Sequence, residues 1–251
     1  MSKRSTEILY GVHPVREAFK AGRREIFRLY TTRGQNHGRI AKLLWYADKQ
    51  RIPVQTVTAG QMAGLAQTDR HQGVCIETGF YPLVGLEELY ERVSPVSRRG
   101  RLLLLDNVVD PHNLGALIRT ACCAAFDGVI TTKDRSAPPT PTVSKTSAGA
   151  LEHIRLARIT NMARTIKELQ RCGLWVVGLA GEARLAVYEV DLSGPTALVV
   201  GSEAKGIRPL VKKTCDRLVA IPQSGTIDSL NASVAGGIAI YEIYRQQLVR
   251  A

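Results

Sequence analysis

The stretch IPQSGTIDSLNASVAGGIAIYEIY, residues 221–244, decides the fold of the chain. It follows an apolar strand pattern, which ends at Pro222 because proline cannot donate the hydrogen bond that a central strand needs. A polar loop that contains glycine comes next, and apolar residues then recur at helical spacing. Ser229 or Asn231 caps this helix, since both have short polar side chains. An ordinary strand-to-helix connection is one interpretation, and a ligand crevice in an open α/β sheet is the other.

Two earlier stretches share this design. They are LLLLDNVVDPHNLGALIRTA, residues 102–121, and ALVVGSEAKGI, residues 197–207. Each runs from a short apolar pattern, typical of a buried parallel strand, into a polar turn with glycine. The turn after the first strand is not GxGxxG, which excludes a dehydrogenase-like dinucleotide site. Arg119 follows in a mostly apolar segment, so it should find an anionic or hydrogen-bonding partner.

The remaining hydrophobic patterns alternate between strand and helix types. In the first 80 residues we expect a turn and a short helix over 8–20, strands at 25–31, 53–57 and 73–78, and helices at 39–50 and 59–66. Such alternation is typical of a compact α/β domain. Further along we expect a loop over 106–113, broken by Pro111, and a helix over 114–125. Residues 133–150 are rich in Pro, Ser and Thr, a composition that favours irregular structure.

Together the three stretches resemble the motifs of the SpoU (TrmH-type) RNA 2′-O-methyltransferases of the SPOUT superfamily. The residues that match the three motifs are Asn113, Gly115 and Arg119, then Gly201, Glu203 and Gly206, then Ile221, Pro222, Gly225, Ser229, Leu230 and Asn231. Three motifs in the right order, each at a strand exit, make the resemblance specific. It covers the whole chain and looks closest to the branch that methylates guanosine in 23S ribosomal RNA.

The resemblance implies an α/β protein of two domains. Residues 100–251 would form a SPOUT methyltransferase domain with a deep C-terminal trefoil knot, and residues 81–99 a linker. Residues 1–80 would form a small α/β domain that resembles ribosomal protein L30e and binds the RNA substrate. The knot rests on the family alone, because nothing in hydrophobic periodicity indicates one. The segment 133–150 would cross near the active site, with a helix or bend at 145–149.

The resemblance also implies the cofactor S-adenosylmethionine and a ribose 2′-hydroxyl as the methyl acceptor. The catalytic residues would be Asn113, Arg119, Glu203, Ser229 and Asn231. The cofactor would be bound by Leu179, Ala180, Gly181, Gly201, Ile221, Ser229 and Leu230, because small-residue turns allow close backbone approach. A guanidinium is a poor base, so we assign Arg119 to positioning the 2′-oxygen and its neighbouring phosphate. Glu203 would hold Arg119 or orient the second-motif loop.

The composition indicates a globular protein with a polyanionic partner. The chain has 251 residues, 45% of them hydrophobic, and a formal net charge of +12. This charge favours RNA, since each neutralised phosphate releases counterions. No apolar run approaches the length of a membrane span, and the N-terminus has no signal-peptide pattern, so we expect no membrane association. Five cysteines without CxxC indicate reduced thiols and a cytoplasmic protein. The five scattered histidines predict no metal site.

Positive charge is densest in the first 98 residues, which hold 15 Lys and Arg against 9 Asp and Glu. The candidates for contact with the RNA backbone are Arg23, Arg24, Arg28, Arg33, Arg39, Lys42 and His37. The alternative is that each of these is simply a solvated charge on an exposed face.

Rival functions stay open at this point. The alternatives to a ribosomal-RNA methyltransferase are a transfer-RNA ribose methyltransferase, an antibiotic-resistance methyltransferase of the same fold, and an RNA-binding protein without catalysis. Members of the family act as homodimers with the site near the interface. In the final helix, 232–248, the candidate interface residues are Ile238, Tyr241 and Leu248. The alternative is that this face packs within one chain.

Overall fold

The computed structural model describes residues 5–32, 38–93, 100–226 and 229–249. Contacts divide the chain into two compact units. The first consists of the residues up to Pro82 together with Pro139–His153, and the second consists of Leu83–Pro138 and Ile154 onward. The observed units differ from the predicted division at 80 and 100 in two respects. The stretch that begins at Leu83, predicted as a linker, belongs to the second unit, and Pro139–His153 packs with the first.

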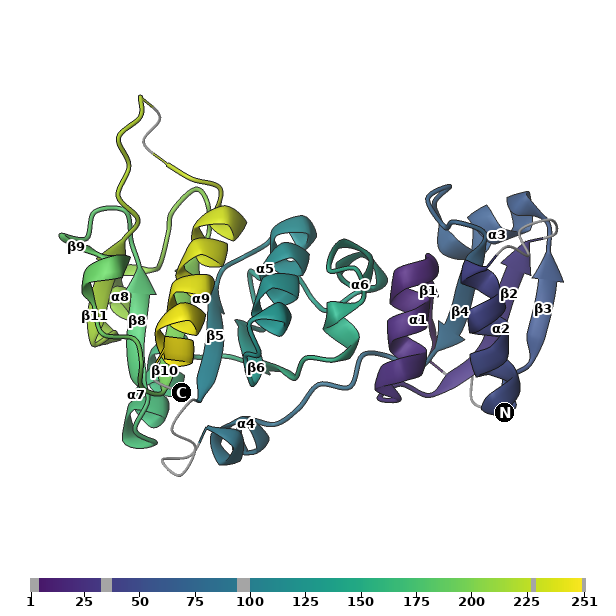
Figure 1. The fold of residues 1–251 in the computed structure, drawn as a ribbon, viewed down its shortest axis with the longest axis horizontal. Coiled ribbons are helices and arrows are strands. Elements are labelled where there is room, and N and C mark those ends of the chain that lie inside the picture. The colour runs from purple at the N-terminus through teal and green to yellow at the C-terminus, as the bar shows by residue number, and fades with distance from the viewer. Residues whose placement is uncertain (1–4, 33–37, 94–99, 227–228, 250–251) are drawn as a thin grey trace. The chain divides into compact units, whose positions relative to one another are not determined.

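A mixed four-stranded sheet lies at the centre of the first unit (Figure 1). Its strands are β1 (Glu7–Tyr10), β2 (Ile26–Thr32), β3 (Val54–Val57) and β4 (Val74–Thr78), in the order β1-β4-β2-β3. β4 is antiparallel to β1 and β2, and β3 is parallel to β2. The helices are α1 (Val12–Ala21), α2 (Arg39–Lys49) and α3 (Ala59–Ala66). β1 was expected to be a turn, and it forms because a distant strand, β4, supplies its hydrogen bonds.

Helix α3 agrees with its predicted bounds because a local signal starts it. Thr58 Oγ1 accepts a hydrogen bond from the backbone N of Gln61 at 3.2 Å, and Gln61 Oε1 accepts one from the backbone N of Thr58 at 2.9 Å. This reciprocal capping box satisfies two backbone donors that the first turn of a helix leaves unpaired.

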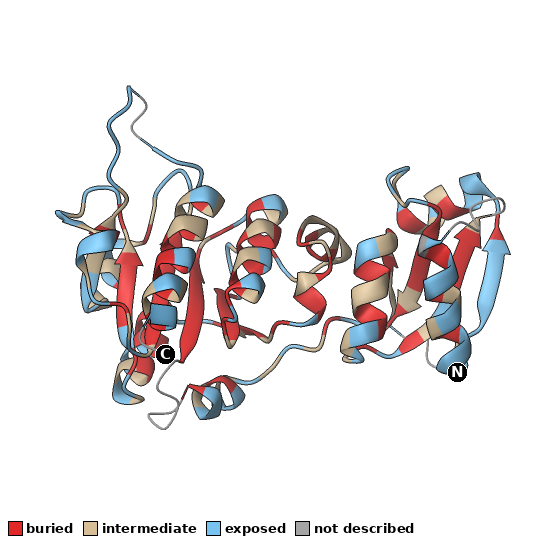
Figure 2. Ribbon diagram, viewed as in Figure 1, coloured by how far each residue is buried: buried red, intermediate tan, exposed pale blue. Residues whose placement is uncertain are grey.

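Seven parallel strands form the sheet of the second unit. They are β5 (Arg101–Asp106), β6 (Gly128–Thr132), β7 (Leu156–Ile159), β8 (Trp175–Leu179), β9 (Leu185–Ala186), β10 (Thr196–Gly201) and β11 (Arg217–Ala220), in the order β7-β6-β5-β10-β8-β11-β9. All six pairings are parallel. The central strands are buried along their length, as Figure 2 shows. The predicted α/β class is confirmed.

Helices cover this sheet. They are α4 (Leu86–Arg92), α5 (Pro111–Cys123), α7 (Met162–Arg171), α8 (Pro209–Thr214) and α9 (Ala232–Val249), with a short 3-10 helix, η2 (Val187–Glu189). α5 and α9 lie side by side (Figure 1). They approach closely at Gly236, where an added Cβ would lie 2.4 Å from Leu117 Cδ2. α4 lies in the stretch expected to be a linker, yet its Leu89 is fully buried in the core of the second unit.

Helix α5 begins three residues earlier than expected. Pro111 was predicted to break a loop, but it occupies the first position of the helix. Proline is well suited to that position, because the backbone N–H that it lacks would have no partner there and its φ is already helical. The Asp110 side chain caps the helix by accepting a hydrogen bond from the backbone N of His112 at 2.9 Å. Asn113 therefore lies in the first helical turn and not in a loop.

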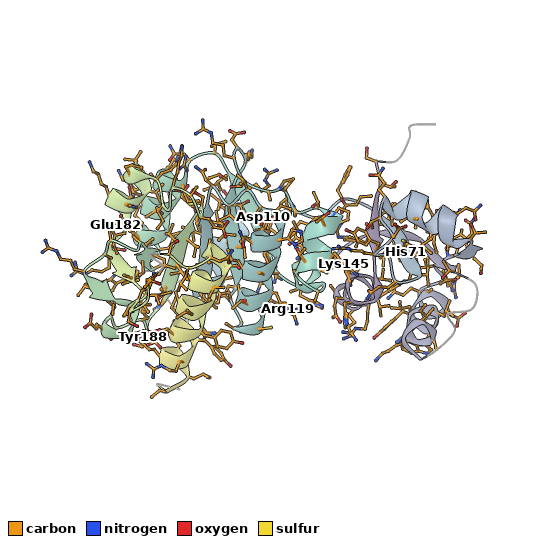
Figure 3. All side chains as sticks on the ribbon, turned by 90° about the horizontal axis from the view of Figure 1, so that it is seen from above. His71, Asp110, Arg119, Lys145, Glu182 and Tyr188 are labelled. Atoms are coloured by element: carbon orange, nitrogen blue, oxygen red, sulfur yellow. The ribbon has the colours of Figure 1, made fainter. Side chains whose placement is uncertain are left out.

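The segment 139–153 belongs to the first unit. It contains α6 (Pro141–Thr146) and a 3-10 helix, η1 (Ala150–Glu152), and α6 packs against β1. Lys145, labelled in Figure 3, donates a hydrogen bond to Gln72 Oε1 at 2.9 Å. Glu152 accepts two hydrogen bonds from the Arg24 guanidinium, at 2.6 and 3.1 Å. Long-range ion pairing thus orders a segment whose composition predicted irregular structure.

The cysteines form no disulfide, and all five are free. Burial raises the pKa of the Cys75 thiol to about 12, with a small opposing effect of Lys145. Burial also raises the pKa of Cys215 to about 12, helped by Asp216 and Asp106. These two thiols stay protonated and unreactive in the folded protein. Within the described residues, no helix combines the length and the hydropathy that a membrane-spanning helix needs.

Candidate active site

The loops that carry the three motifs leave the sheet at one edge. Gly201 at the end of β10 lies opposite Asp106 at the end of β5, so the turns after these strands begin side by side. After β5 the chain goes to β6 and β7 on one side, and it places β8 to β11 on the other. The boundary between β5 and β10 is therefore a topological switch point, where ligands of open α/β sheets bind.

One side chain from each motif meets at this boundary. Asn231 Nδ2 donates a hydrogen bond to Asn113 Oδ1 at 3.0 Å and another to the Glu203 carboxylate. Asn113 is buried in the first turn of α5, whereas Glu203 and Asn231 are exposed on their loops. Three of the five predicted catalytic residues thus form one hydrogen-bonded group.

Asn231 is also the cap of α9. Its Oδ1 accepts hydrogen bonds from the backbone N of Ser233 at 2.9 Å and of Val234 at 3.2 Å. Between the two caps considered from the sequence, the structure therefore selects Asn231. Because Oδ1 bonds to the helix, the amide is held with Nδ2 toward Asn113 and Glu203.

The turn that presents Glu203 depends on two glycines. Its ends pair through hydrogen bonds between the backbones of Ser202 and Gly206, at 3.2 and 2.8 Å. Gly206 has a φ of 60°, a left-handed conformation that favours glycine. A Cβ on Gly201 would lie 2.1 Å from the Gly206 carbonyl carbon, so the tight turn needs glycine there as well.

Asp106 holds the chain that follows this turn, and the sequence interpretation did not single it out. Its buried carboxylate accepts hydrogen bonds from the Arg208 backbone N at 2.9 Å and Nε at 2.8 Å. The ion pair to Arg208 Nη2 measures 2.6 Å. The available signal was the acidic residue directly after the apolar run LLLL, because a buried charge needs a partner.

The motif loops enclose a cavity of about 130 Å³. All seven residues predicted to bind the cofactor line it: Leu179, Ala180, Gly181, Gly201, Ile221, Ser229 and Leu230. Glu203 contributes the one charged side chain of its described lining, and Ala232 and Ala235 of α9 close it. At the side of Gly181, Lys212 pairs with Glu182, and that hydrogen bond lowers the pKa of the Glu182 carboxyl.

A larger cavity of about 590 Å³ adjoins the first. The two share Ser202, Glu203 and Ala232, so the turn of the second motif forms their common wall. Asn107, Asp110, Arg135 and Lys205 also line the larger cavity, as does Asn113. The sequence analysis named none of the first four as site residues. Arg135 follows β6, and the order of the strands brings that loop to the same edge of the sheet.

Arg119 is not brought together with the other predicted catalytic residues. Arg119, labelled in Figure 3, is exposed on α5. It is not among the residues that line the two cavities. Six residues separate it from Asn113, a rotation of about 600° at roughly 100° per residue, so the two point about 120° apart around the helix. It makes no hydrogen bond or ion pair with any described residue of this chain, so the anionic partner expected from the sequence is not found among them.

The predicted RNA contacts have diverse surroundings. The prediction for Arg24 is wrong, because its side chain is buried against Glu7 and Glu152 and is neither available to RNA nor solvated. Arg23 donates hydrogen bonds to Tyr81 Oη and to the Pro82 carbonyl, both at 3.2 Å. Lys42 is exposed, and Arg28 bonds to Gln55. Arg33, His37 and the side chain of Arg39 lie outside the described residues. No group of three or more His, Cys, Asp or Glu side chains gathers as a possible metal site in the described part of the chain.

Comparison with known families gives two matches. Residues 100–241 match the model of the SpoU rRNA Methylase family. Residues 8–84 match a model described as RNA 2'-O ribose methyltransferase substrate binding. The first match covers the sheet, both cavities and the three motifs, and the second covers most of the first unit.

Individual proteins resemble the chain over nearly its whole length. A 23S rRNA (guanosine-2'-O-)-methyltransferase RlmB of Pseudomonas putida is 41% identical, covering 97% of this chain and 98% of its own. The protein of the same name from Pseudomonas aeruginosa is 43% identical, over 96% of this chain and 97% of its own. The solved SpoU methyltransferase AviRb of Streptomyces viridochromogenes, in complex with AdoMet, superposes with a TM-score of 0.81 at 23% identity, covering 97% of this chain and 91% of its own.

Proposed function

The chain belongs to the SpoU rRNA Methylase family, and from this premise we propose that it transfers a methyl group from S-adenosylmethionine to a ribose 2′-hydroxyl of RNA. One observation carries the proposal above the others. Asn113, Asn231 and Glu203, one residue from each motif, are hydrogen-bonded together beside the common wall of two adjoining cavities. A donor in one cavity and an acceptor in the other would meet at that wall.

The smaller cavity fits the proposed cofactor in chemistry. Leu179, Ile221 and Leu230 provide an apolar wall for a flat adenine ring, and the small residues beside them leave backbone groups accessible for hydrogen bonds. Together with the space next to it, the cavity is in the range of roughly 300–1,000 Å³ typical of small-molecule sites. When bound, S-adenosylmethionine supplies a methyl group already activated on a positively charged sulfur, and the Glu203 carboxylate at the wall suits that charge.

The residues at the wall orient the acceptor. We assign to the Glu203 carboxylate a hydrogen bond from the ribose hydroxyl, and to Asn231 the task of holding that carboxylate in place. Asn113 fixes Asn231 in turn. Ser229 lines the donor side of the wall. Orientation of this kind is a large source of rate acceleration in displacement reactions. Arg119, exposed on α5 outside the two cavities of its own chain, is available to the RNA.

The relatives support guanosine of 23S ribosomal RNA as the target. Both Pseudomonas proteins named above carry that substrate in their names, and they align with nearly the whole chain. Their agreement favours ribosomal RNA over transfer RNA, and the intact set of polar residues at the wall favours an enzyme over a non-catalytic RNA-binding protein. The match of residues 8–84 to a substrate-binding model supports an RNA-binding role for the first unit.

The test is methyl transfer from labelled S-adenosylmethionine to separate pools of unmodified ribosomal and transfer RNA. We expect label in 23S rRNA, on the ribose of one guanosine located by mapping the modified nucleotide. Label in transfer RNA alone would replace the proposed substrate. Cofactor uptake by calorimetry without label in either pool would support the non-catalytic alternative.

A substitution at Ala235 tests the cofactor cavity. Ala235→Leu adds a larger side chain to the wall of a cavity of about 130 Å³, so it takes up space that the cofactor needs. The affinity for S-adenosylmethionine should fall at least about tenfold, which corresponds to a loss of about 1.4 kcal/mol of binding free energy. Leucine is a good helix former, so α9 should stay intact. Calorimetric titration measures the affinity, and Ala41→Leu, the same change at an exposed position of α2 outside the cavity, is the control. Equal affinities of both variants would place the cofactor elsewhere.

We further propose that the protein is a homodimer through α9. Val234, Tyr241 and Leu248 are each about half exposed and recur along one stripe of this helix, with the half-buried Ile238 between them. Such a stripe of apolar side chains is typical of an interface. Sedimentation at the 27.4 kDa of one chain would contradict the dimer.

The trefoil knot and the cytoplasmic location also stay proposals. The convergence of the chain after β8, β10 and β11 on one cavity supports the knot, and the five free cysteines support a reducing compartment. An experimental electron-density map traced from β11 through α9 decides the first. Fractionation of cells that express the protein decides the second.

A further inference from the structure

The larger cavity contains two cationic side chains that the proposed mechanism does not use. Arg135 lies in the loop after β6, and Lys205 lies in the turn after β10. Both side chains are exposed, and within the described residues neither one makes an ion pair or a hydrogen bond. Arg135 adopts a φ of 55°, an uncommon conformation for a residue other than glycine. Two unpaired cations therefore face one cavity from separate loops.

The same cavity also contains acidic side chains. Asp110 and Glu203 both line it, and Asp110 is held there as the cap of α5. An RNA strand that enters this cavity would meet two carboxylates, which repel its phosphates. Arg135 and Lys205 are the charges that compensate this repulsion, and they are the groups in the cavity that suit a phosphate, Arg by its fork of donors and Lys by its point charge.

The chemistry of RNA sets the position of one phosphate. A 2′-hydroxyl that reaches the common wall at Ser202 and Glu203 is on the ribose carbon next to the one that bears the 3′-phosphodiester. That phosphodiester must therefore lie within a few bonds of the wall, on the side of the larger cavity. Lys205 is two residues after Glu203 in the same turn, so its side chain starts beside the wall.

We propose that Arg135 and Lys205 bind the phosphodiester on the 3′ side of the target ribose. They act as positioning residues, because the phosphate that they hold fixes the neighbouring 2′-oxygen against the wall. The larger cavity then receives the sugar–phosphate backbone of the target nucleotide. This inference rests on the proposed methyltransferase function and adds two residues to the phosphate contact that the family resemblance gives to Arg119.

The experiment combines a charge deletion in the protein with one in the RNA. The protein variants are Arg135→Gln/Lys205→Gln and, as a matched control, Lys167→Gln, an exposed cation of α7 that lines neither cavity. The RNA is a ribosomal fragment that carries the mapped target, with either its natural 3′-phosphodiester or an uncharged methylphosphonate at that one linkage. The readouts are kcat/KM for methyl transfer, S-adenosylmethionine affinity by calorimetry, and RNA affinity as a function of salt.

On natural RNA the double variant should lose about 100-fold in kcat/KM, about tenfold for each charged contact. On the methylphosphonate RNA the wild-type protein should lose a similar factor and the double variant almost nothing more. The slope of log affinity against log salt should fall by about 1 in the double variant. S-adenosylmethionine affinity should be unchanged, which shows that the folded cavities persist, and Lys167→Gln should behave as wild type throughout.

Independent losses overturn the inference. If the methylphosphonate lowers kcat/KM of the double variant by the same factor as that of the wild type, the two side chains do not contact that phosphate. A double variant with wild-type kcat/KM and salt slope excludes the contact as well. A wild-type protein that binds S-adenosylmethionine but methylates no RNA defeats the proposed function, and the inference with it, so the two failures are distinct.

Discussion

Replacing Asn231 with aspartate is expected to reduce methyl transfer by about 100- to 1,000-fold while the protein remains folded. The aspartate keeps the side-chain oxygen that accepts hydrogen bonds from Ser233 and Val234, and aspartate is as good a helix cap as asparagine. It loses the Nδ2 donor that joins Asn113 to Glu203. It also places a second carboxylate beside Glu203, and the repulsion between the two negative charges pushes these side chains apart. The hydrogen-bonded group of residues 113, 203 and 231 is therefore broken, whereas the helix cap is kept.

The measurements are single-turnover methyl transfer and thermal unfolding. Asn231→Ala is the matched variant, because it loses the cap as well and should lower the free energy of unfolding by about 1 kcal/mol. Asn231→Asp should stay closer to wild type in stability. Full activity of Asn231→Asp would show that the hydrogen bonds among the three residues have no part in the reaction.

The methyl-transfer rate of Asn231→Asp should also depend on pH in a way that the wild-type rate does not. Two adjacent carboxylates raise the pKa of one of them, so the pair gains a proton as the pH falls. A protonated carboxyl can donate the hydrogen bond that the amide donated. The ratio of wild-type to variant rate should therefore shrink between about pH 7 and pH 5. A constant ratio over this pH range would show that the variant is slow because the site is distorted, and not because the hydrogen-bond donor of residue 231 is missing.

Removing the Glu152 carboxylate is the change expected to cost the most stability. The Arg24 side chain is fully buried, and Glu152 pairs with it through two hydrogen bonds while Ser144 donates a third to Glu152 at 2.7 Å. Glu152→Ala leaves a buried guanidinium whose remaining acidic partner, among the residues that the structure describes, is Glu7. Breaking a buried pair in this way typically costs about 3–5 kcal/mol. Glu152→Gln should cost less, since it keeps an acceptor for Arg24.

Urea unfolding measures this difference. Glu88→Ala is the control, because Glu88 also pairs with an arginine, Arg155, but its side chain is 45% exposed, and such pairs contribute at most about 1 kcal/mol. Hydrogen exchange should show α6 losing protection in Glu152→Ala, since the pair joins the segment 139–153 to the first unit. If the two alanine variants unfold at the same urea concentration, the buried pair contributes no more to the free energy of unfolding than the exposed pair.

Much of the second unit could be predicted because its signals are local. An apolar run of six or fewer residues followed by a polar glycine turn appears three times. Each time a strand of the parallel sheet ends there, and two of these strands, β5 and β10, are fully buried. The seven residues assigned to the cofactor from family resemblance line one cavity, although their role stays a prediction. The start of α5 was wrong for an equally local reason, since Pro111 was taken as a breaker where it serves as the first helical residue.

Other features depend on partners far away in the chain. β1 pairs with β4, and the long-range bond between Arg24 and Glu152 orders a segment that composition marked as irregular. Periodicity indicates the type of an element but not its neighbours, so neither pairing was accessible. The exposed face of Arg119 was missed because a helix that starts at Pro111 fixes the angle between Arg119 and Asn113, whereas the motif gives only their spacing.

By itself, the sequence determined the class of the fold, the three turns and the residues that belong to them, because strand ends, glycine turns and helix caps are properties of short stretches. The tertiary structure alone decided which of these residues meet. It joined Asn113, Asn231 and Glu203 at one wall, placed Arg135 and Lys205 around the cavity beside it, and buried Arg24 with Glu152. The physical reason is that a parallel sheet gathers the carboxyl ends of distant strands at one edge, and only the order and register of those strands state which loops become neighbours.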